Sequence, residues 1–502
     1  MSIYKIVFNN KILCKYSMKK VHIIGGGPTG LFIGLLCKKL NIDCEIYEKN
    51  SYIGGHHHVE PETMHAPRCI WLNEMKNLKN ILNEFDVEKK TIFQNRIMDY
   101  DTLSYTEYIK LWYSLFFDLP INYNKLKNTR SCEYLSFFDN KTRSMLLHIN
   151  TYIAAESKNS PITKLLVAAT FLNIQTMIYR FNNNSFLNLN NDWIKSIENI
   201  LHRNNVNIHK STIVTDLNVK NNKVISFNAN RIFHNVKDED EVVLAMDPQG
   251  IIKLLSTSDK MIKQNWGDFI DFKNKLMMST YKSIGITFIT KNYSEKNNTW
   301  LFDKITNLNI TLYYDSNGKY YASICDLDKT INGRKLEYMS PKELKLEIIK
   351  DMNKTYPEID IQDIKIHNDA WYDGEKWQCS HTACAQDARV GLFEPKGNIE
   401  NLQFRNSLTK GRTFIMTTLE TCSESAISYM NSISDTKVEH YKHDYNSLHK
   451  RIFLLSIGII VPLIVIYILY KLVYLLITRI PFWSFVKSFI LIKELKKRKK
   501  KR

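Results

Sequence analysis

The chain has 502 residues, a formal net charge of +18 at pH 7 and nine cysteines. Residues 451–502 hold twelve Lys and Arg against one acid, Glu494, so this segment carries +11 and the first 450 residues carry only +7. A mildly basic body without a nucleic-acid-binding motif argues against a nucleic-acid partner. The cysteines include no CxxC pair, which favours free thiols in a reducing compartment. The length allows about two or three domains.

The first predicted elements lie in residues 21–34, where an apolar run, a cluster of glycines and a periodic apolar run follow one another. This order predicts a strand, a tight turn and a helix, and the turn has the GxGxxG pattern of dinucleotide-binding proteins. In that pattern Gly25 allows the tight turn, Gly27 lets the backbone approach a pyrophosphate, and Gly30 lets the helix pack closely on the strand.

The N-terminus of this helix, at Pro28 and Thr29, would offer N–H groups and the positive end of its dipole to the phosphates. A second strand is predicted at residues 44–47 and ends at Glu48, 18 residues after Gly30. A carboxylate at this place accepts hydrogen bonds from a ribose diol and disfavours NADP, whose 2′-phosphate it would repel. A glycine turn without a ligand is the alternative, which the strand, helix and acid around the motif disfavour.

The segment from Glu48 to His56, with Gly54 and Gly55 near its end, resembles the second glycine signature of the flavin-containing amine oxidase superfamily. This superfamily includes amine oxidases, phytoene desaturase-like enzymes, protoporphyrinogen oxidase and UDP-galactopyranose mutase. The resemblance implies that the dinucleotide is FAD and that Lys49, Gly55 and His56 contact it. The basic residues common around the glycine pair in the family are replaced here, among others by His56.

The middle of the chain is predicted to interleave two domains. Residues 71–170 show repeated apolar spacing and few turn signals, which predicts a helical lobe on the substrate side. One helix and four strands are predicted next, at 192–205, 206–209, 211–217, 223–227 and 240–247. This order resembles the returning half of the family's FAD domain, which implies that Val214 contacts the adenine through its backbone. Ordinary α/β structure is the alternative.

The following stretch alternates between strand and helix patterns. The predicted elements are two strands and one helix, at 283–290, at 320–325 and from Ser340 onward. Ser340 is a favourable N-cap, and Pro341 suits the first helical position. The first strand resembles the substrate-domain sheet of the family. Trp371 and Trp377 lie in a region that approaches the flavin in the family, which implies a substrate wall, with core packing as the alternative for each.

The last family element is residues 412–430, which resemble a strand leading into a helix whose N-terminus faces the ribityl chain and the pyrophosphate. The family usually has Ala-Gly followed by an acid here, and then a helix start similar to Glu-Gly-Ala. The resemblance implies that Glu420 takes the place of the acid and that Ala426 lies beside the cofactor. The glycines of the family are missing at both places, so the match is partial.

A membrane anchor is predicted near the C-terminus. Residues 452–470 form a 19-residue apolar run with Ser456 as its single polar side chain, and such a helix spans roughly 28 Å. A buried helix of a soluble protein is the alternative, although such helices are rarely so uniformly apolar. Residues 471–502 are amphipathic and end in a basic cluster that suits an anionic membrane surface. Because the N-terminal residues do not resemble a signal peptide, we expect a cytosol-facing body and leave a single span or a hairpin open.

These interpretations predict an α/β fold in which a Rossmann-like FAD-binding domain is interleaved with an α+β substrate domain and followed by a C-terminal transmembrane helix. The predicted parts are a leader at 1–19, FAD-binding parts at 20–66, 201–260 and 399–436, a helical lobe at 67–200, a substrate domain at 261–398, a linker at 437–451, the membrane helix at 452–470 and the tail at 471–502.

Four histidines near the glycine signature, His56, His57, His58 and His65, invite a metal interpretation. Three consecutive residues of a strand cannot all point the same way, so they make a poor set of ligands. We therefore predict no metal site.

The resemblance implies a membrane-anchored, FAD-dependent oxidoreductase of the amine oxidase type. Such an enzyme passes a hydride from a C–N or C–C bond of its substrate to flavin N5, and the membrane anchor suggests a small-molecule or lipid-like substrate. Two alternatives stay open, namely a non-redox flavoenzyme similar to UDP-galactopyranose mutase and a scaffold that has lost its chemistry. The sequence assigns no catalytic residue and no oligomeric state.

Overall fold

The computed structural model describes residues 19–57, 69–70, 75–87, 95–97, 103–152, 157–168, 187–188, 192–291, 299–301, 306–308, 310–314, 320–380, 382–445, 465–474, 486 and 488–494. The chain divides into two compact units. One comprises Met1–Leu111 with Asn124–His443, and the other comprises Trp112–Tyr123 with Asp444–Arg502. All the sheets described below belong to the first unit.

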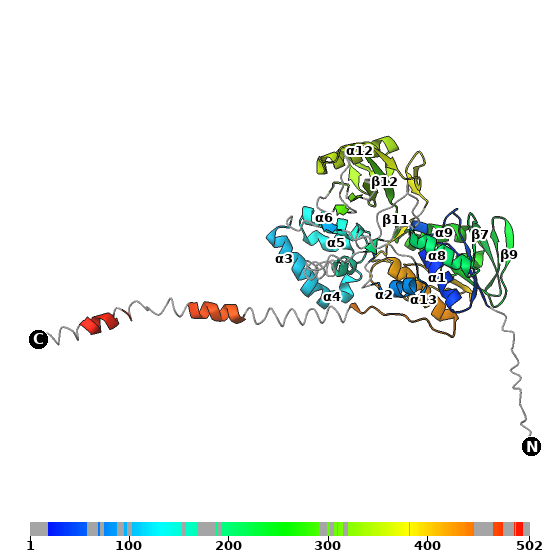
Figure 1. Cartoon of the computed structure of the whole chain (residues 1–502), viewed down its shortest axis with the longest axis horizontal. Helices are drawn as coiled ribbons and strands as arrows, with labels where there is room; N and C mark the ends of the chain where they lie inside the picture. Colours follow the sequence, from blue (N-terminus) through cyan, green and yellow to red (C-terminus); the bar gives the residue numbers. More distant parts are fainter. Residues whose placement is uncertain are drawn as a thin grey trace, which may run out of the picture. The chain divides into compact units, whose positions relative to one another are not determined.

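A five-stranded parallel sheet forms the centre of the Rossmann-like part (Figure 1). Its order is β22 (Leu402–Phe404), β10 (Glu241–Leu244), β1 (Lys20–Ile24), β2 (Asp43–Tyr47) and β6 (Asn207–His209). The strands come from the beginning, the middle and the end of the chain, as an interleaved arrangement requires, and the domain bounds stay a prediction. The apolar side chains of β1 are at most 2% exposed, as expected for a central strand of a parallel sheet covered on both faces.

Four helices belong to one side of this sheet, namely α1 (Pro28–Lys39), α2 (Lys76–Glu84), α8 (Asp192–Arg203) and α13 (Leu419–Ile433). Helix α1 packs on α8 and α13, and α2 packs on α13. All nine residues from Thr29 to Cys37 are buried. Gly34 makes this packing possible, because a Cβ there would come within 3.1 Å of Ile46 and 3.2 Å of Leu201.

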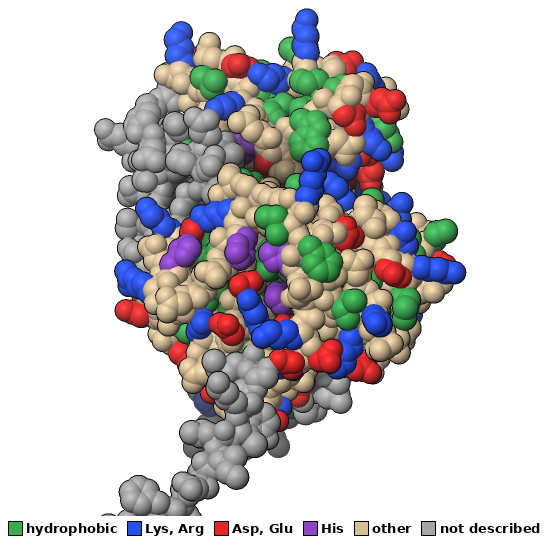
Figure 2. Space-filling view, turned by 90° about the vertical axis from the view of Figure 1, so that its right-hand side faces the viewer, with side chains coloured by type: hydrophobic (Ala, Val, Ile, Leu, Met, Phe, Trp, Pro, Cys, Tyr) green, Lys and Arg blue, Asp and Glu red, His purple; other side chains and the backbone are tan. Residues whose placement is uncertain are grey.

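An antiparallel meander of β7 (Val214–Lys220), β8 (Lys223–Ala229) and β9 (Ile232–Asn235) packs near α9 (Pro248–Thr257). Aromatic rings join the meander to the parallel sheet. Tyr47 of β2 stacks on His209 at 4.8 Å between ring centroids and meets Phe227 edge-on at 5.1 Å. His234 stacks on Phe227 at 5.0 Å. Figure 2 shows histidine side chains gathered on the face that it views.

A second, six-stranded sheet forms the core of the substrate-side part. Its order is β18 (Ile361–Ile366), β12 (Ile284–Thr290), β15 (Tyr320–Ile324), β14 (Thr311–Tyr314), β13 (Thr299–Leu301) and β4 (Asn95–Ile97). Helix α12 (Pro341–Thr355) packs on β18. Its N-cap, Ser340, accepts a hydrogen bond from the N–H of Glu343, whose carboxylate accepts one from the N–H of Ser340. The predicted helix start is therefore confirmed.

The remaining elements are short. The two-stranded sheets are β3 (Cys69–Ile70) with β5 (Leu187–Asn188), β11 (Thr280–Tyr281) with β21 (Ala383–Cys384), β16 (Thr330–Ile331) with β17 (Arg334–Lys335), and β19 (Ala370–Tyr372) with β20 (Trp377–Cys379). The other helices are α3 (Tyr105–Tyr113), α4 (Leu119–Leu126), α5 (Ser131–Tyr134), α6 (Asn140–Tyr152), α10 (Lys260–Lys263) and α11 (Phe269–Met278), with a π-helical segment at Ser114–Asp118 and single turns at Gly55–His57, Leu135–Phe137 and Leu336–Tyr338.

Three expectations from the sequence need correction. The helical region 71–170 also contains β4, which pairs with β13 about two hundred residues away and so has no local signal. Strand β9 was not predicted. The strand expected before α13 is absent, because the backbone N–H groups of Thr413 and Phe414 donate to the carboxylate of Glu424 instead of joining a sheet.

The predicted membrane helix, residues 452–470, lies mostly outside the described residues, of which 465–474 are helical. Within the described part of the chain, no helix combines the length and the apolar character needed to cross a membrane. The predicted leader, residues 1–19, also lies outside the described residues except for Lys19.

Candidate cofactor site

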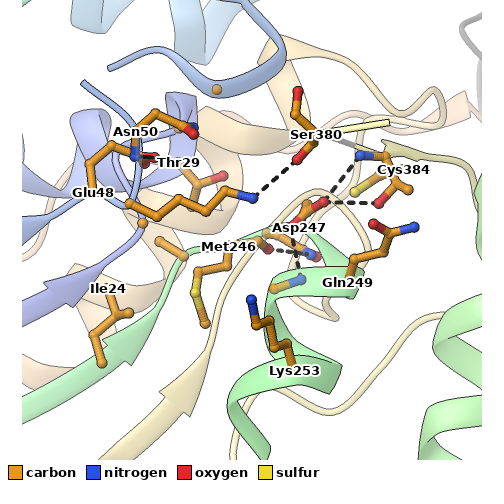
Figure 3. A pocket seen from close by; sticks show the side chains of 18 of the residues that line it. Ile24, Thr29, Glu48, Asn50, Met246, Asp247, Gln249, Lys253, Ser380 and Cys384 are labelled. Atoms are coloured by element: carbon orange, nitrogen blue, oxygen red, sulfur yellow. Dashed lines mark hydrogen bonds between the residues drawn. The ribbon is translucent and has the colours of Figure 1, made fainter. Parts of the chain in front are cut away.

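A cavity of about 780 Å³ opens where β1, β2 and β10 end. Ligands of doubly wound α/β folds bind at this carboxyl edge, and the volume lies within the usual range for small-molecule sites. In Figure 3, Glu48 and Asn50 lie on one side of the cavity, and Gln249 and Lys253 extend from α9 on the other.

The glycine turn after β1 forms one wall. Gly25 has a φ of +114°, and a Cβ there would lie 2.5 Å from the carbonyl oxygen of Ala245. A Cβ at Gly30 would lie 2.0 Å from the carbonyl oxygen of Gly25. Gly27 differs from both, since a Cβ there would meet no atom within 4 Å. Gly25 and Gly30 are thus required for packing, whereas Gly27 leaves space on the cavity side.

Helix α1 begins at this wall. Its N-cap is Gly27, which provides no side-chain cap, and Pro28 is its first residue. The N–H of Leu31 is bonded to the carbonyl oxygen of Gly27 at 3.0 Å. The N–H groups of Thr29 and Gly30 precede this bond and belong to the helix start that intrahelical bonds leave available. Pro28 and Thr29 line the cavity, whereas Gly30 lies behind them.

Glu48 lies at the end of β2 and lines the cavity with only 5% of its surface exposed. Its Oε2 accepts a hydrogen bond from the N–H of Gly26 at 2.8 Å, and its Oε1 accepts one from the N–H of Asn50 at 2.9 Å. Burial raises the pKa of Glu48, and these two backbone hydrogen bonds oppose the rise without cancelling it. Each carboxylate oxygen can accept a further hydrogen bond.

The next residues extend this wall. The Nζ of Lys49 donates to the carbonyl oxygen of Ser380 at 3.0 Å, which joins the β2 edge to the loop after β20. Val214 lines the cavity together with its neighbours in the meander, Thr212, Ile213 and Thr215. The position of Val214 beside Glu48 agrees with the adenine contact that the resemblance implies, which stays a prediction.

The opposite end of the cavity is built from three distant parts of the chain, namely Thr382–Cys384, Asn406–Ser407 and the start of α13. Asp247, the N-cap of α9, joins two of the cavity walls. Its Oδ1 accepts from the N–H of Gly250 at 2.9 Å, and its Oδ2 accepts from the N–H and Oγ1 of Thr382 at 3.1 and 3.0 Å.

Two cysteine thiols line this end. Burial raises the pKa of Cys384 to about 12 and that of Cys422 to about 11. Burial therefore favours the protonated form of both thiols at neutral pH, whereas the thiolate is the reactive form. Thr417 and Thr418 complete the wall at the N-terminus of α13.

Comparisons with known proteins agree with this geometry. Residues 23–85 match the family model of an NAD(P)-binding Rossmann-like domain. A comparison with curated proteins gives no match. Solved structures of similar fold include putrescine oxidase bound to putrescine, cyclohexylamine oxidase from Brevibacterium oxydans and a fatty acid isomerase from P. acnes, with 11%, 12% and 13% identity and TM-scores of 0.57, 0.55 and 0.54. Each similarity covers 83% of this chain. It covers 98% of the putrescine oxidase, 98% of the cyclohexylamine oxidase and 99% of the fatty acid isomerase.

The chain has the amine oxidase fold.

The resemblance of residues 48–56 to the second glycine signature implies FAD, and the cavity residues fit this cofactor. The open space at Gly27 and the start of α1 suit a pyrophosphate. The buried carboxylate of Glu48 suits the adenosine ribose. Gly55 lines the cavity close to the turn, since a Cβ there would lie 3.3 Å from the Cα of Gly27.

Glu420 does not line the cavity, although the resemblance gave it a place at the cofactor. Its fully buried carboxylate accepts hydrogen bonds from the N–H and Nδ2 of Asn77, at 3.0 and 2.8 Å, and from the N–H of Leu78 at 2.7 Å. The Nε2 of His443 lies 2.9 Å from the same carboxylate. Glu420 thus satisfies the start of α2. Ala426, which is also fully buried within α13, does not line the cavity either.

A C-terminal strap, residues 437–443, lies against α2 and α13. The side chain of Asn431 bonds both backbone groups of Val438, at 2.9 and 2.7 Å, and the side chain of Asn77 bonds both backbone groups of Tyr441, at 3.0 and 2.8 Å. The first half of the predicted linker 437–451 is therefore bound to the body.

Glu424, which is fully buried, supports the turn before α13. Burial favours a higher pKa for Glu424, but contacts with His440, Thr413 and Phe414 outweigh it and lower this pKa. The Nε2 of His440 lies 3.5 Å from the carboxylate. Glu420 and Glu424 together hold the strap and the preceding turn against the helix whose N-terminus reaches the cavity.

The histidine cluster gives no metal site among the residues that the structure describes. His57 lines the cavity, the side chain of His56 is not described, and His58 and His65 lie outside the described residues. The two tryptophans of the predicted substrate wall, Trp371 and Trp377, differ in their surroundings. Trp371 lines the cavity and is 48% exposed, whereas Trp377 is 2% exposed and its Nε1 donates to the carbonyl oxygen of Met339 at 2.9 Å.

Several cavity residues were not predicted, among them Asp247, Thr382, Asn406, Ser407 and Thr418. Asp247 precedes Pro248 and Thr418 precedes α13, so both had the signal of a helix N-cap. The other three lie in irregular segments between short elements, where the sequence has no periodic pattern to place them.

Proposed function

We propose that the chain is an FAD-dependent oxidoreductase of the amine oxidase type. One observation carries the proposal: a single cavity joins the glycine turn and Glu48 to the N-terminus of α13, at the carboxyl edge of the parallel sheet. This arrangement provides an acceptor for ribose hydroxyls at one end and helix N–H groups for phosphates in the middle.

The residues of the chain would bind and orient the cofactor. Glu48 would accept the ribose hydroxyls, the backbone at Gly27 and Thr29 would hold the pyrophosphate, and the meander residues around Val214 would cover the adenine. When bound, FAD supplies a hydride acceptor at N5. We propose a C–N or C–C bond of the substrate as the hydride donor.

The substrate would approach the end of the cavity opposite Glu48. The cavity is lined in part by aromatic and small side chains, including Tyr281, Trp371 and Ala383, which would suit the apolar part of a small-molecule or lipid-like substrate. No charged residue of the chain is assigned to catalysis. The protonated thiols of Cys384 and Cys422 add to the neutral character of this wall.

The proposal includes a membrane anchor. The apolar run at 452–470 and the basic tail at 471–502 support it by composition alone. We propose that they attach the body to a membrane and that the body faces the cytosol.

Three other functions remain as proposals. A non-redox flavoenzyme similar to UDP-galactopyranose mutase would use the same cofactor site. The fatty acid isomerase of similar fold favours a second, non-redox possibility with a lipid substrate. A chain that binds FAD without turnover would be a scaffold.

The test begins with the full chain purified in detergent and its visible absorption spectrum after desalting. A two-banded flavin spectrum that persists supports the cofactor, and a folded, colourless protein that takes up no added FAD contradicts it. Anaerobic addition of amines then distinguishes the functions. Bleaching of the flavin supports the oxidoreductase. Isomerisation of a UDP-sugar or a fatty acid without net bleaching supports a non-redox enzyme. If FAD is bound but neither bleaching nor isomerisation occurs, the scaffold is supported.

A further inference from the structure

Helix α3, Tyr105–Tyr113, is labelled in Figure 1. The distribution of its side chains is unusual. Its large apolar residues follow the helical spacing i, i+3, i+4, i+7 and i+8, and they face solvent. We call them the α3 stripe: Tyr105, Tyr108, Ile109, Trp112 and Tyr113, with exposed fractions of 81%, 43%, 51%, 36% and 51%.

The inward face of α3 is partly charged. Glu107 is only 3% exposed, and Leu111 is 5% exposed. The carboxylate of Glu107 accepts hydrogen bonds from the Nζ of Lys110 at 2.6 Å and from the N–H of Asp139 at 3.0 Å. Surface helices normally turn their apolar stripe to the core and their charges to water, so α3 has the opposite polarity.

Further large apolar side chains are exposed outside α3. Trp112 stacks on Phe116 at 4.3 Å between ring centroids. Ile121 is 61% exposed and Phe137 is 51% exposed. The Nζ of Lys110 lies 5.1 Å from the centre of the Phe137 ring. Exposed apolar side chains that gather in this way mark a contact with another protein or with a membrane.

We propose that the α3 stripe docks on a lipid bilayer. The proposal rests on the membrane anchor described under the proposed function. Three of the five side chains are tyrosine and one is tryptophan, which carry an apolar ring with a polar tip and concentrate at the membrane–water interface.

The organisation of the chain favours lipid over a soluble partner. Trp112–Tyr123 forms one compact unit with the chain from Asp444 onward, and the predicted anchor begins eight residues after Asp444, at 452. Burial and the nearby charge of Asp444 both raise the pKa of Tyr123, which agrees with contact between the two parts of this unit. The end of the α3 stripe thus belongs to the unit that carries the anchor.

The test uses the full chain reconstituted in vesicles of phosphatidylcholine and phosphatidylserine, with or without acyl chains that carry bromine. Bromine quenches tryptophan fluorescence at short range, and iodide in the buffer quenches tryptophans exposed to water. The difference between wild type and Trp112→Phe isolates the Trp112 component. Trp371→Phe is the control, because Trp371 lines the cavity and is 48% exposed.

We expect brominated lipid to quench most of the Trp112 fluorescence and iodide to leave it unchanged. For Trp371 we expect iodide to quench the fluorescence and brominated lipid to leave it unchanged. In Ile109→Glu, Trp112 should become accessible to iodide. The matched variant Ile232→Glu, at a site on β9 that is 64% exposed, should behave as wild type.

Three outcomes would count differently. Wild type that fails to float with the vesicles contradicts the membrane anchor itself. Wild type that floats while iodide, and not bromine, quenches Trp112 overturns the α3 docking alone. A Trp112 component that neither agent quenches also overturns it, because the stripe would then be covered by protein, either a second copy or the chain's own tail.

Discussion

Glu48 and Glu420 are both buried carboxylates of the Rossmann-like part, yet only Glu48 lines the cavity. Glu48 receives hydrogen bonds from Gly26 and Asn50, which lie within 22 residues of it in the sequence. Glu420 receives them from Asn77 and contacts His443. The same residue type therefore belongs to the ligand site at one place and to the packing of helices at the other.

The comparison shows that the two ends of the cavity differ in which parts of the chain build them. The end around Glu48 is built by one continuous segment, residues 25–57, and by the meander that follows β6. The end around α13 is built by short segments that only tertiary packing brings together. The predictions below test this difference, beginning with the largest expected effect.

The glycine turn should separate packing from ligand binding. Gly30→Ala places a methyl group against the carbonyl oxygen of Gly25, so we expect a loss of about 3 kcal/mol in the free energy of unfolding. Gly27→Ala meets no atom within 4 Å, so we expect normal stability but weakened FAD binding. Urea unfolding and fluorescence titration with FAD measure the two effects. Equal loss of stability in both variants would contradict the distinction.

The two glutamates should differ in the same way. Glu420→Gln removes a buried charge that pairs with His443 and α2, and we expect a loss of about 3 kcal/mol in stability. Glu48→Gln should lower the affinity for FAD by roughly tenfold to a hundredfold, with a smaller loss of stability. Thermal unfolding without FAD and FAD titration of both variants provide the measurement. A larger loss of FAD affinity in Glu420→Gln than in Glu48→Gln would contradict the prediction, because Glu420 and not Glu48 would then contact the cofactor.

The pH dependence of unfolding without FAD should have opposite signs for Glu424, which supports the turn before α13, and for Glu48, which lines the cavity. The pKa of Glu424 is lowered below its ordinary 4.5 in the folded state, so its stabilising contribution is present above pH 4.5 and is lost as the pH falls through the lowered pKa. The pKa of Glu48 is raised above 4.5, so its contribution is present below pH 4.5 and is lost as the pH rises through the raised pKa.

Urea unfolding across this range, with Glu424→Gln and Glu48→Gln as variants, measures the two slopes. Each variant should flatten its own part of the profile. FAD affinity should also fall as the pH drops through the raised pKa of Glu48, because protonation removes an acceptor for the ribose hydroxyls. A wild-type profile that both variants leave unchanged would show that neither carboxylate titrates as described.

The smallest effects are expected in the hairpin of β19 and β20. Trp377→Phe removes a buried hydrogen bond to Met339 and should cost about 1 kcal/mol. Trp371→Phe, at an exposed position, should change stability by less than about 0.5 kcal/mol. If Trp371 contacts the substrate, its variant should raise KM, and Trp377→Phe should not. Steady-state kinetics with the substrate identified by flavin bleaching would test this.

The sequence predicted the parts whose information is local. The turn at Gly25–Gly30, the strand that ends at Glu48 and the helix capped by Ser340 each depend on residues that are neighbours in the chain. The fold class followed from these elements and their order. The expectation for Val214, which lines the cavity, came from the resemblance to the family, and its contact with the adenine stays a prediction.

The rest depends on contacts between distant segments. Strand β4 needs β13, and Glu420 reaches Asn77, 343 residues away. The segment before α13 was expected to form a strand because it resembles the last element of the family, but Glu424 takes its N–H groups. A single sequence does not contain these pairings in any local pattern, so residue types alone could not place them.

The order of the strands in the parallel sheet has a consequence for synthesis of the chain. Strand β22 ends at Phe404 and pairs with β10, which pairs with β1 near the N-terminus. At typical translation rates, β22 leaves the ribosome roughly 8 to 32 s after β10, because about 160 residues separate the two strands. During that time the edge of β10 that later receives β22 waits without its final neighbour. The nascent protein therefore carries an open sheet edge while these residues are made, which is a period when a chaperone or an early-bound cofactor would have the greatest effect on yield.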